Sequence, residues 1–360
     1  MRWVNVRIVL GLFLLLCPAF LSAEENRPVV AGYTPFKDEE ADKAYELNQK
    51  GVEFFNANDF PQALQCFEEA YALTPDDKTV MENLFAVNTH LAVDRLKKKE
   101  FEAALDYLMK ARALRNAENV EKNIAFAYFS LAQEVYDKTK DVEQTLQHME
   151  KGLEFDPNNT HMQEQASLLL YNRAMELYGQ HEYKSAAAML DRSLQYNPRQ
   201  SYAHEVLGDI AYYNQDLDNA QKHWQTAGEI EPSERIVKKM SKLAGEIDVD
   251  KGLKDYPSEY FIVKYAKDEQ FYSGYKIREL LRKAYRTVGN DFNYYPKRKI
   301  VVLLYGPEEM DSILSKQHWA GAVYDGKIRL PQENAGVTDA NLRALIAHEY
   351  THAIVHDLAG

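Results

Sequence analysis

Three residues in positions 348–352, which read His-Glu-Tyr-Thr-His, have the types and the spacing of a metal-dependent hydrolytic site. On a helix, side chains four residues apart lie on one face, roughly 6 Å apart at their bases, so His348 and His352 can direct their imidazoles at one zinc ion. Glu349 is rotated to the side of this pair, where its carboxylate can act as a general base on water acidified by zinc. The pattern predicts zinc-dependent amide hydrolysis; the alternative is a solvent-facing helix that happens to be rich in polar residues.

Residues 251–360 must supply the elements that position this helix. Asp339 can cap it, and its apolar spacing continues to about Leu358. Upstream, the pattern predicts a strand at 260–265, a helix at 275–288, a buried strand at 300–305 and a hairpin with arms 322–324 and 327–330 around Asp325-Gly326. The order strand, helix, strand, hairpin, helix is typical of an α+β domain.

With its flanking residues, LRALIAHEYTHAIVHDL, the motif resembles the active-site helix of the zincin metallopeptidases. Residues 255–360 are most similar to the peptidase MA-like group of the gluzincin branch. The resemblance implies that His348 and His352 bind Zn2+, that Glu349 is the catalytic base, and that the substrate is a peptide or protein. It also implies an edge strand that binds the substrate backbone by β-augmentation. The residues expected in that strand are Gly321, Ala322, Val323 and Tyr324.

A third protein ligand for catalytic zinc is missing from the pattern. By the same resemblance, gluzincins take it from a Glu on a later helix, whereas the sequence stops at Gly360, eight residues after His352. His356 lies a full turn further along the helix, Asp357 does not fit the metzincin spacing, and His318 is supported by its identity alone. Two explanations stay open: the sequence is a truncated product, which we expect because the metal helix would otherwise leave an apolar face uncovered, or the domain has lost its catalytic half.

The region before residue 250 contains five seventeen-residue segments that align without gaps. Each begins with Asp or Glu and has a mostly small residue at position five, a large apolar residue at position nine and a mostly small residue at position twelve, all on one helix face. Four of the five end in Pro, which stops a helix. The segments are 59–75, 100–116, 141–157, 182–198 and 216–232.

These segments resemble the second helix of the tetratricopeptide repeat (TPR). The first three intervals between segment ends are equal, and the fourth is seven residues shorter. That shorter interval has the usual repeat length of about 34 residues. Because the segments align without gaps, the seven extra residues are expected in longer first helices of the middle repeats or in the junctions before them. Gly51, Ala92, Ala174 and Gly208 fit the small-residue position of the first helix, and Gln133 does not.

The TPR resemblance covers residues 40–235 and implies a solenoid that binds a protein partner on a concave face built from first helices. By that resemblance, several aromatic and polar side chains are candidates for this groove, although each could instead pack between neighbouring helices. They are Tyr45, Asn48, Phe55, Tyr171, Tyr202, Tyr212 and Tyr213.

Residues 1–23 have the features of a secretory signal peptide. Arg2 and Arg7 precede an apolar run at 8–21, which a small residue, Ala23, follows. Fourteen apolar residues are too few to cross a bilayer as a helix. We therefore expect an exported protein, periplasmic or extracellular, with no transmembrane span in the mature chain. Lipidation of Cys17 is the alternative, although no small residue precedes that cysteine.

Composition and charge exclude other classes. The 360 residues are 27% charged and 46% hydrophobic, which excludes a collagen or a low-complexity disordered chain. Residues 24–250 carry 25 basic and 41 acidic side chains, a net charge of −16, which repels phosphate backbones. We therefore expect no nucleic-acid partner. Without the signal peptide Cys66 is the one remaining cysteine, so no intramolecular disulfide is possible.

Together these patterns predict an α-helical TPR solenoid followed by an α+β zincin-like metallopeptidase domain. The expected parts are a signal peptide at 1–23, a linker at 24–39, the TPR array with its capping helix at 40–250 and a peptidase MA-like zincin domain, incomplete at its C-terminus, at 251–360. The predicted function is an exported zinc metallopeptidase whose TPR array docks a substrate or partner. The alternative is a TPR protein-interaction scaffold with a truncated or inactive peptidase-like domain.

Overall fold

The computed structural model describes residue 28 and residues 39–256, 258–266, 271–305, 323–331 and 339–359. The chain divides into two compact units, Met1–Ala166 and Ser167–Gly360. Thirteen helices and five strands lie in the described residues. No helix among them is long and apolar enough to cross a membrane. The predicted signal peptide at 1–23, including Cys17, lies outside the described residues.

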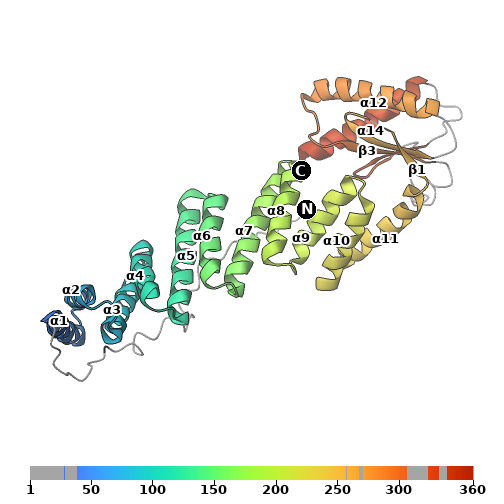
Figure 1. Ribbon diagram of the computed structural model, residues 1–360. Helices are drawn as coiled ribbons and strands as arrows, with labels where there is room; N and C mark the ends of the chain where they lie inside the picture. Colours follow the sequence, from blue (N-terminus) through green and yellow to red (C-terminus); the bar gives the residue numbers. More distant parts are fainter. Residues whose placement is uncertain are drawn as a thin grey trace. The chain divides into compact units, whose positions relative to one another are not determined.

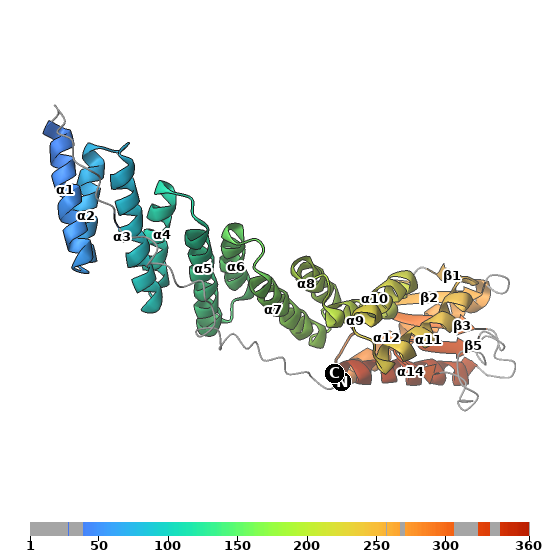
Figure 2. The same ribbon diagram turned by 90° about the horizontal axis from the view of Figure 1, so that it is seen from below.

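The first unit is an array of helices in which each helix packs against the next along the chain (Figures 1 and 2). Its helices are α1 (Glu39–Asn56), α2 (Phe60–Leu73), α3 (Lys78–Lys97), α4 (Phe101–Leu114), α5 (Glu118–Thr139) and α6 (Val142–Phe155), and the first residues of α7 (Thr160–Gly179) also belong to it. The second unit continues the series with most of α7 and with α8 (Tyr183–Tyr196), α9 (Ser201–Tyr213), α10 (Leu217–Ile230) and α11 (Glu234–Asp250).

The five seventeen-residue segments contain the second helices of the pairs: α2, α4, α6, α8 and α10, each 14 residues long. The acidic residue that opens each segment precedes its helix. Asp59, Asp141 and Asp216 accept a hydrogen bond from the backbone N–H three residues on, which satisfies one of the unpaired donors of the first turn. Glu100 and Glu182 make no such bond.

The repeated large residue of each segment fills the space inside its own helical pair. Phe67, Leu108, Met149, Leu190 and Trp224 are all at most 3% exposed. In the first and fifth pairs the first helix makes room with glycine: a Cβ at Gly51 would overlap the ring of Phe67, and one at Gly208 the indole of Trp224. In these two pairs, the glycine of the first helix and the large residue of the second helix therefore pack directly against each other.

The first helices have the lengths that the spacing of the segments predicts. The helices in the three longer intervals, α3, α5 and α7, have 20, 22 and 20 residues, whereas α9, in the shorter interval, has 13. The prediction that the extra residues lengthen the first helices is confirmed.

The second unit ends in a small mixed sheet with two helices. Its elements are β1 (Leu253–Tyr256), β2 (Phe261–Ala266), α12 (Phe271–Phe292), β3 (Ile300–Tyr305), β4 (Val323–Tyr324), β5 (Ile328–Pro331) and α14 (Asp339–Ala359). The strand order is β1-β2-β3-β5-β4, in which β2–β3 and β3–β5 are parallel and the two outer pairs antiparallel. Every element predicted in 260–358 is present, and β1 is an addition to the prediction.

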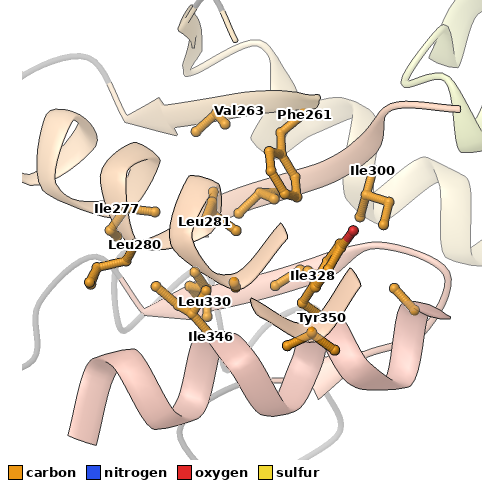
Figure 3. Close-up of a cluster of buried hydrophobic side chains, with 14 of the residues drawn as sticks. Phe261, Val263, Ile277, Leu280, Leu281, Ile300, Ile328, Leu330, Ile346 and Tyr350 are labelled. Carbon is orange, nitrogen blue, oxygen red and sulfur yellow. The ribbon is translucent and has the colours of Figure 1, made fainter. Parts of the chain in front are cut away.

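Helices α12 and α14 cover one face of this sheet (Figure 1). Figure 3 shows the core between these helices and the sheet, where the two helices pack on alternate residues of β2, β3 and β5. The labelled side chains are Phe261, Val263, Ile277, Leu280, Leu281, Ile300, Ile328, Leu330, Ile346 and Tyr350. All six residues of β3 are buried because both faces of the sheet are covered.

The other face of the sheet packs on the last helices of the array through buried charges. Glu246 of α11 accepts from Lys327 Nζ at 2.9 Å and from Arg329 Nη2 at 2.6 Å, and the Tyr212 hydroxyl also donates to it. The three charged side chains are at most 1% exposed. Burial lowers the pKa of Lys327 to about 8. Burial alone would raise the pKa of Glu246, but Lys327 and Arg329 outweigh it and lower that pKa.

Candidate metal centre

The two predicted zinc ligands lie together on the exposed face of α14. The Nε2 atoms of His348 and His352 are 3.1 Å apart and their ring centroids 4.6 Å apart. Neither side chain is buried, because the opposite face of the helix packs against the sheet in the core. That buried face is formed by Leu342, Ile346, Tyr350, Ala353 and Ile354.

Glu349, the predicted base, is buried between the helix and the sheet edge, with 5% of its surface exposed. A backbone hydrogen bond from Tyr324 of β4 reaches its carboxylate. Burial raises the pKa of Glu349, while His348, His352 and the Tyr324 bond act in the opposite direction. A partly desolvated carboxylate beside two imidazoles has the environment of a general base.

The two imidazoles could supply two of the three protein ligands that a catalytic zinc ion needs. With Zn–N bonds of about 2.0–2.1 Å, two nitrogens on a tetrahedral ion lie about 3.3 Å apart, close to the 3.1 Å found between His348 and His352. Two ligands of one ion can have this separation, which is also a hydrogen-bond distance between the two rings. Within the part of the chain that the structure describes, no group of three or more His, Cys, Asp or Glu side chains could hold a metal. A third protein ligand is thus not found among the described residues.

The other ligand candidates have different surroundings. Asp357 is fully buried and pairs with Arg298, with Nη2 3.3 Å from Oδ1. The ring of His356 stands 5.9 Å from that of Tyr324, and more than half of the His356 side chain is exposed. His318 lies outside the described residues.

Two of the four residues predicted to bind the substrate backbone lie in a strand. Val323 and Tyr324 form β4, which is the last strand in the order of the described sheet and pairs on its inner side with β5. Both residues are half-buried and lie beside α14. Gly321 and Ala322 lie outside the described residues.

The groove candidates of the TPR array divide into packing residues and accessible ones. Asn48, Phe55 and Tyr212 are buried. Asn48 accepts a hydrogen bond from Asn83, the ring of Phe55 packs on Phe60, and Tyr212 donates to Glu246. These three belong to the packing of the helices, which was the alternative interpretation of such residues.

The other four groove candidates are accessible to different degrees. Tyr45, Tyr171 and Tyr213 are half-buried, and 41% of Tyr202 is exposed on α9. Tyr202 is therefore the candidate on which a test of the groove is best placed.

Arg298 was missed at the sequence level. It lies in the segment between α12 and β3, outside any repeat, and its partner Asp357 is 59 residues away in the sequence. The one signal was a run of three basic residues, Lys297 to Lys299, directly before an apolar strand, a pattern common to many surface loops.

Comparison with known proteins gives one family match within the helical array. Residues 171–224 match the tetratricopeptide repeat family. The human protein O-mannosyl-transferase TMTC1 is 22% identical over 198 residues, which are 55% of this chain and 20% of that protein. The match therefore spans about a fifth of the length of this curated relative.

Solved structures of low sequence identity are also similar. YrrB, described as a TPR protein with an unusual peptide-binding site, is 16% identical, with 57% of this chain and 94% of YrrB covered and a TM-score of 0.21. TTC0263, a TPR protein of Thermus thermophilus, is 18% identical, with 56% and 98% covered and a TM-score of 0.19. The TPR2AB domain of yeast Sti1 in its complex with pHSP90 is 17% identical, with 58% and 84% covered and a TM-score of 0.22.

Proposed function

We propose that this TPR repeat protein is an interaction scaffold that binds a protein partner on the concave face of its array. The observation that carries the proposal is the TPR match at residues 171–224, within a series of helical pairs that share one packing pattern. Arrays of this kind present an extended surface of first helices, on which peptide segments bind. Partner binding needs no residue of the candidate metal centre.

The test uses the chain from Glu24 onwards, and peptides selected on it from a random twelve-residue library. Tyr202→Ala changes a first helix and is expected to weaken binding of the selected peptides by tenfold or more, as for an interface aromatic. Met109→Ala is the matched control: Met109 is also 41% exposed but lies on α4, a second helix. Equal effects of the two changes, or no selected peptide, would count against a groove at this position.

A second function, that of a zinc metallopeptidase, is favoured by one observation: His348 and His352 converge beside the buried carboxylate of Glu349. His348 and His352 would hold the ion, and bound zinc would supply Lewis acidity for a peptide carbonyl and for water. Glu349 would take the proton from the attacking water. The outer edge of β4 would orient an extended peptide across the helix.

Zinc stoichiometry tests this second function. We expect close to one zinc per chain in the wild type, loss of zinc in His352→Ala, and retention in His356→Ala, which removes the next exposed histidine of the same helix. Glu349→Gln is expected to keep zinc and to abolish hydrolysis of unfolded casein. A wild-type chain that binds no zinc would leave the interaction scaffold as the function.

Export is part of the proposal and is supported by Arg2, Arg7 and the apolar run at 8–21. Expression in a bacterium followed by N-terminal sequencing of the periplasmic fraction should give a mature chain that begins at Glu24. A retained N-terminus in the cytoplasmic fraction alone would contradict export.

A further inference from the structure

The buried side chain of Arg298 joins the candidate metal helix to the edge strand. Arg298 lies between α12 and β3, and 8% of its side chain is exposed. Its Nη2 is 3.3 Å from Oδ1 of Asp357, near the end of α14, and 3.4 Å from the hydroxyl of Tyr324 in β4. One guanidinium group therefore contacts both elements that form the candidate centre.

The same guanidinium also contacts the helices of the TPR array. Its carbon lies 5.8 Å from the ring centroid of Tyr183, at the start of α8, and 5.6 Å from that of Tyr213, at the end of α9. Cation–π contacts of this kind are stronger when the cation is removed from water. Arg298 thus connects α8 and α9 with β4 and α14.

The buried contacts of Arg298 are expected to add little to the stability of the fold. Several buried polar atoms around them have no hydrogen-bond partner among the described residues: Nε and Nη1 of Arg298, Oδ2 of Asp357, and the hydroxyls of Tyr294 and Tyr350. A buried ion pair with unsatisfied donors and acceptors is a weak source of stability, and apolar side chains of similar volume often serve better. Its contribution is therefore expected in the placement of the elements that it joins.

Both contacts of Arg298 lead directly to the candidate centre. Tyr324 provides the backbone hydrogen bond to Glu349, and Asp357 lies five residues beyond His352, little more than one helical turn. A shift of the strand or of the helix end would therefore move the base relative to the imidazoles.

We infer that Arg298 is a positioning residue for the His348–Glu349–His352 site, and that helices α8 and α9 influence the geometry of this site through it. The inference rests on the zinc function proposed above. It gives the array a role in regulation, because a ligand that displaces Tyr183 or Tyr213 would change the metal affinity of α14 by linkage.

The experiment uses Co2+ as a spectroscopic probe on the chain from Glu24 onwards. Arg298→Met keeps the length of the side chain and removes its charge. It is expected to weaken Co2+ binding about tenfold or more, as for residues that orient metal ligands, and to change the visible absorption of the complex. Arg298→Lys keeps the charge but not the planar fork, so partial rescue is expected.

Lys297→Met is the matched control. Lys297 stands next to Arg298 and joins the same segment to the α7–α8 turn, through Glu182 Oε1 at 3.2 Å and the Gln180 carbonyl at 3.3 Å, but this pair is exposed and does not touch the centre. Unchanged Co2+ affinity and spectrum are expected. Wild-type affinity and spectrum in Arg298→Met would overturn the inference.

Two further measurements cover the remaining outcomes. If Arg298→Met does not fold, Tyr324→Phe removes one contact of the guanidinium and is expected to weaken Co2+ binding about threefold; unchanged binding would overturn the inference. If the wild type binds no Co2+, the zinc function fails. Hydrogen exchange of the amides at 345–358 then tests whether Arg298 still positions α14. Faster exchange in Arg298→Met than in Lys297→Met supports positioning of α14 by Arg298, and equal rates overturn it.

Discussion

At the scale of the residue, Gly208 controls the packing of one helical pair. A Cβ at this position would overlap the indole of Trp224, which is buried and donates to the Asp209 carboxylate at 2.9 Å. The indole cannot move aside without breaking this bond. We expect Gly208→Ala to destabilise the fifth pair by about 1–3 kcal/mol, as for other overpacked sites. Urea unfolding of the chain from Glu24 onwards, followed by tryptophan fluorescence with Trp319 changed to Phe so that the signal comes from Trp224, measures the effect.

Gly245 provides the control for this prediction. It lies within α11, and a Cβ there would meet no atom within 4 Å. Gly245→Ala should therefore raise stability by up to about 1 kcal/mol, because alanine favours the helix more than glycine does. If both substitutions changed stability in the same direction, the close approach of Gly208 to Trp224 would not be the cause.

The sequence predicts which residues lie close together where the periodicity of one helix places them on the same face. His348 and His352 share a helix face because they are four residues apart, and the structure places their Nε2 atoms 3.1 Å apart. Phe55 and Tyr212 sit on first helices, but the sequence does not show which residues cover them. Arg298 was missed for the same reason, since its contacts come from four elements that are distant in the sequence.

At the scale of the element, Glu246 holds α11 against β5. It is the carboxylate that faces both Lys327 and Arg329 in a fully buried cluster. Glu246→Gln would remove the ion pair of Lys327 with Glu246 and one of the two carboxylate partners of Arg329, so we expect a loss of about 3–5 kcal/mol. Native-state hydrogen exchange of the α11 and β5 amides reports the free energy of opening this contact. Asp248→Asn, in an exposed pair of the same helix, should have little effect.

The pH dependence of this loss follows from the lowered pKa of Glu246. The pKa of this carboxyl group is lower in the folded protein than in the unfolded chain, where it is about 4.5. The group therefore contributes its full stabilisation at pH values above the unfolded-state pKa. That stabilisation is lost as the pH falls through the lower, folded-state pKa. The stability difference between wild type and Glu246→Gln should therefore narrow below about pH 4, where Glu246 becomes protonated. A constant difference down to pH 2 would contradict this role.

Element lengths were predictable from the sequence, whereas their pairing was not. The unequal intervals between the repeated segments predict longer first helices in the middle repeats, because ungapped segments leave the extra residues to the first helices or the junctions before them. The strand order β1-β2-β3-β5-β4 depends on partners far apart in the chain. The strand β1 has four residues, with a charged pair, Lys254 and Asp255, at its centre, so no apolar pattern marks it.

At the scale of the whole molecule, the array and the C-terminal part of the chain differ in net charge. Residues 24–250 have a net charge of −16, whereas 251–360 have a net charge of +2. An acidic surface attracts basic segments and accelerates their association, and salt screens this attraction within about 10 Å at 0.1 M. The array should therefore prefer partners with basic binding segments, and duplex nucleic acid should not bind.

Two twelve-residue peptides of the same apolar pattern, one with four lysines and one with four glutamates, test this preference on the chain from Glu24 onwards. We expect the lysine peptide to bind at least tenfold more tightly at 20 mM salt, chiefly through faster association. The advantage should shrink at 500 mM salt because the charges are then screened. A preference that persists unchanged at high salt would instead indicate buried ion pairs in the groove, and equal binding at low salt would show that the net charge of the array does not select its partner.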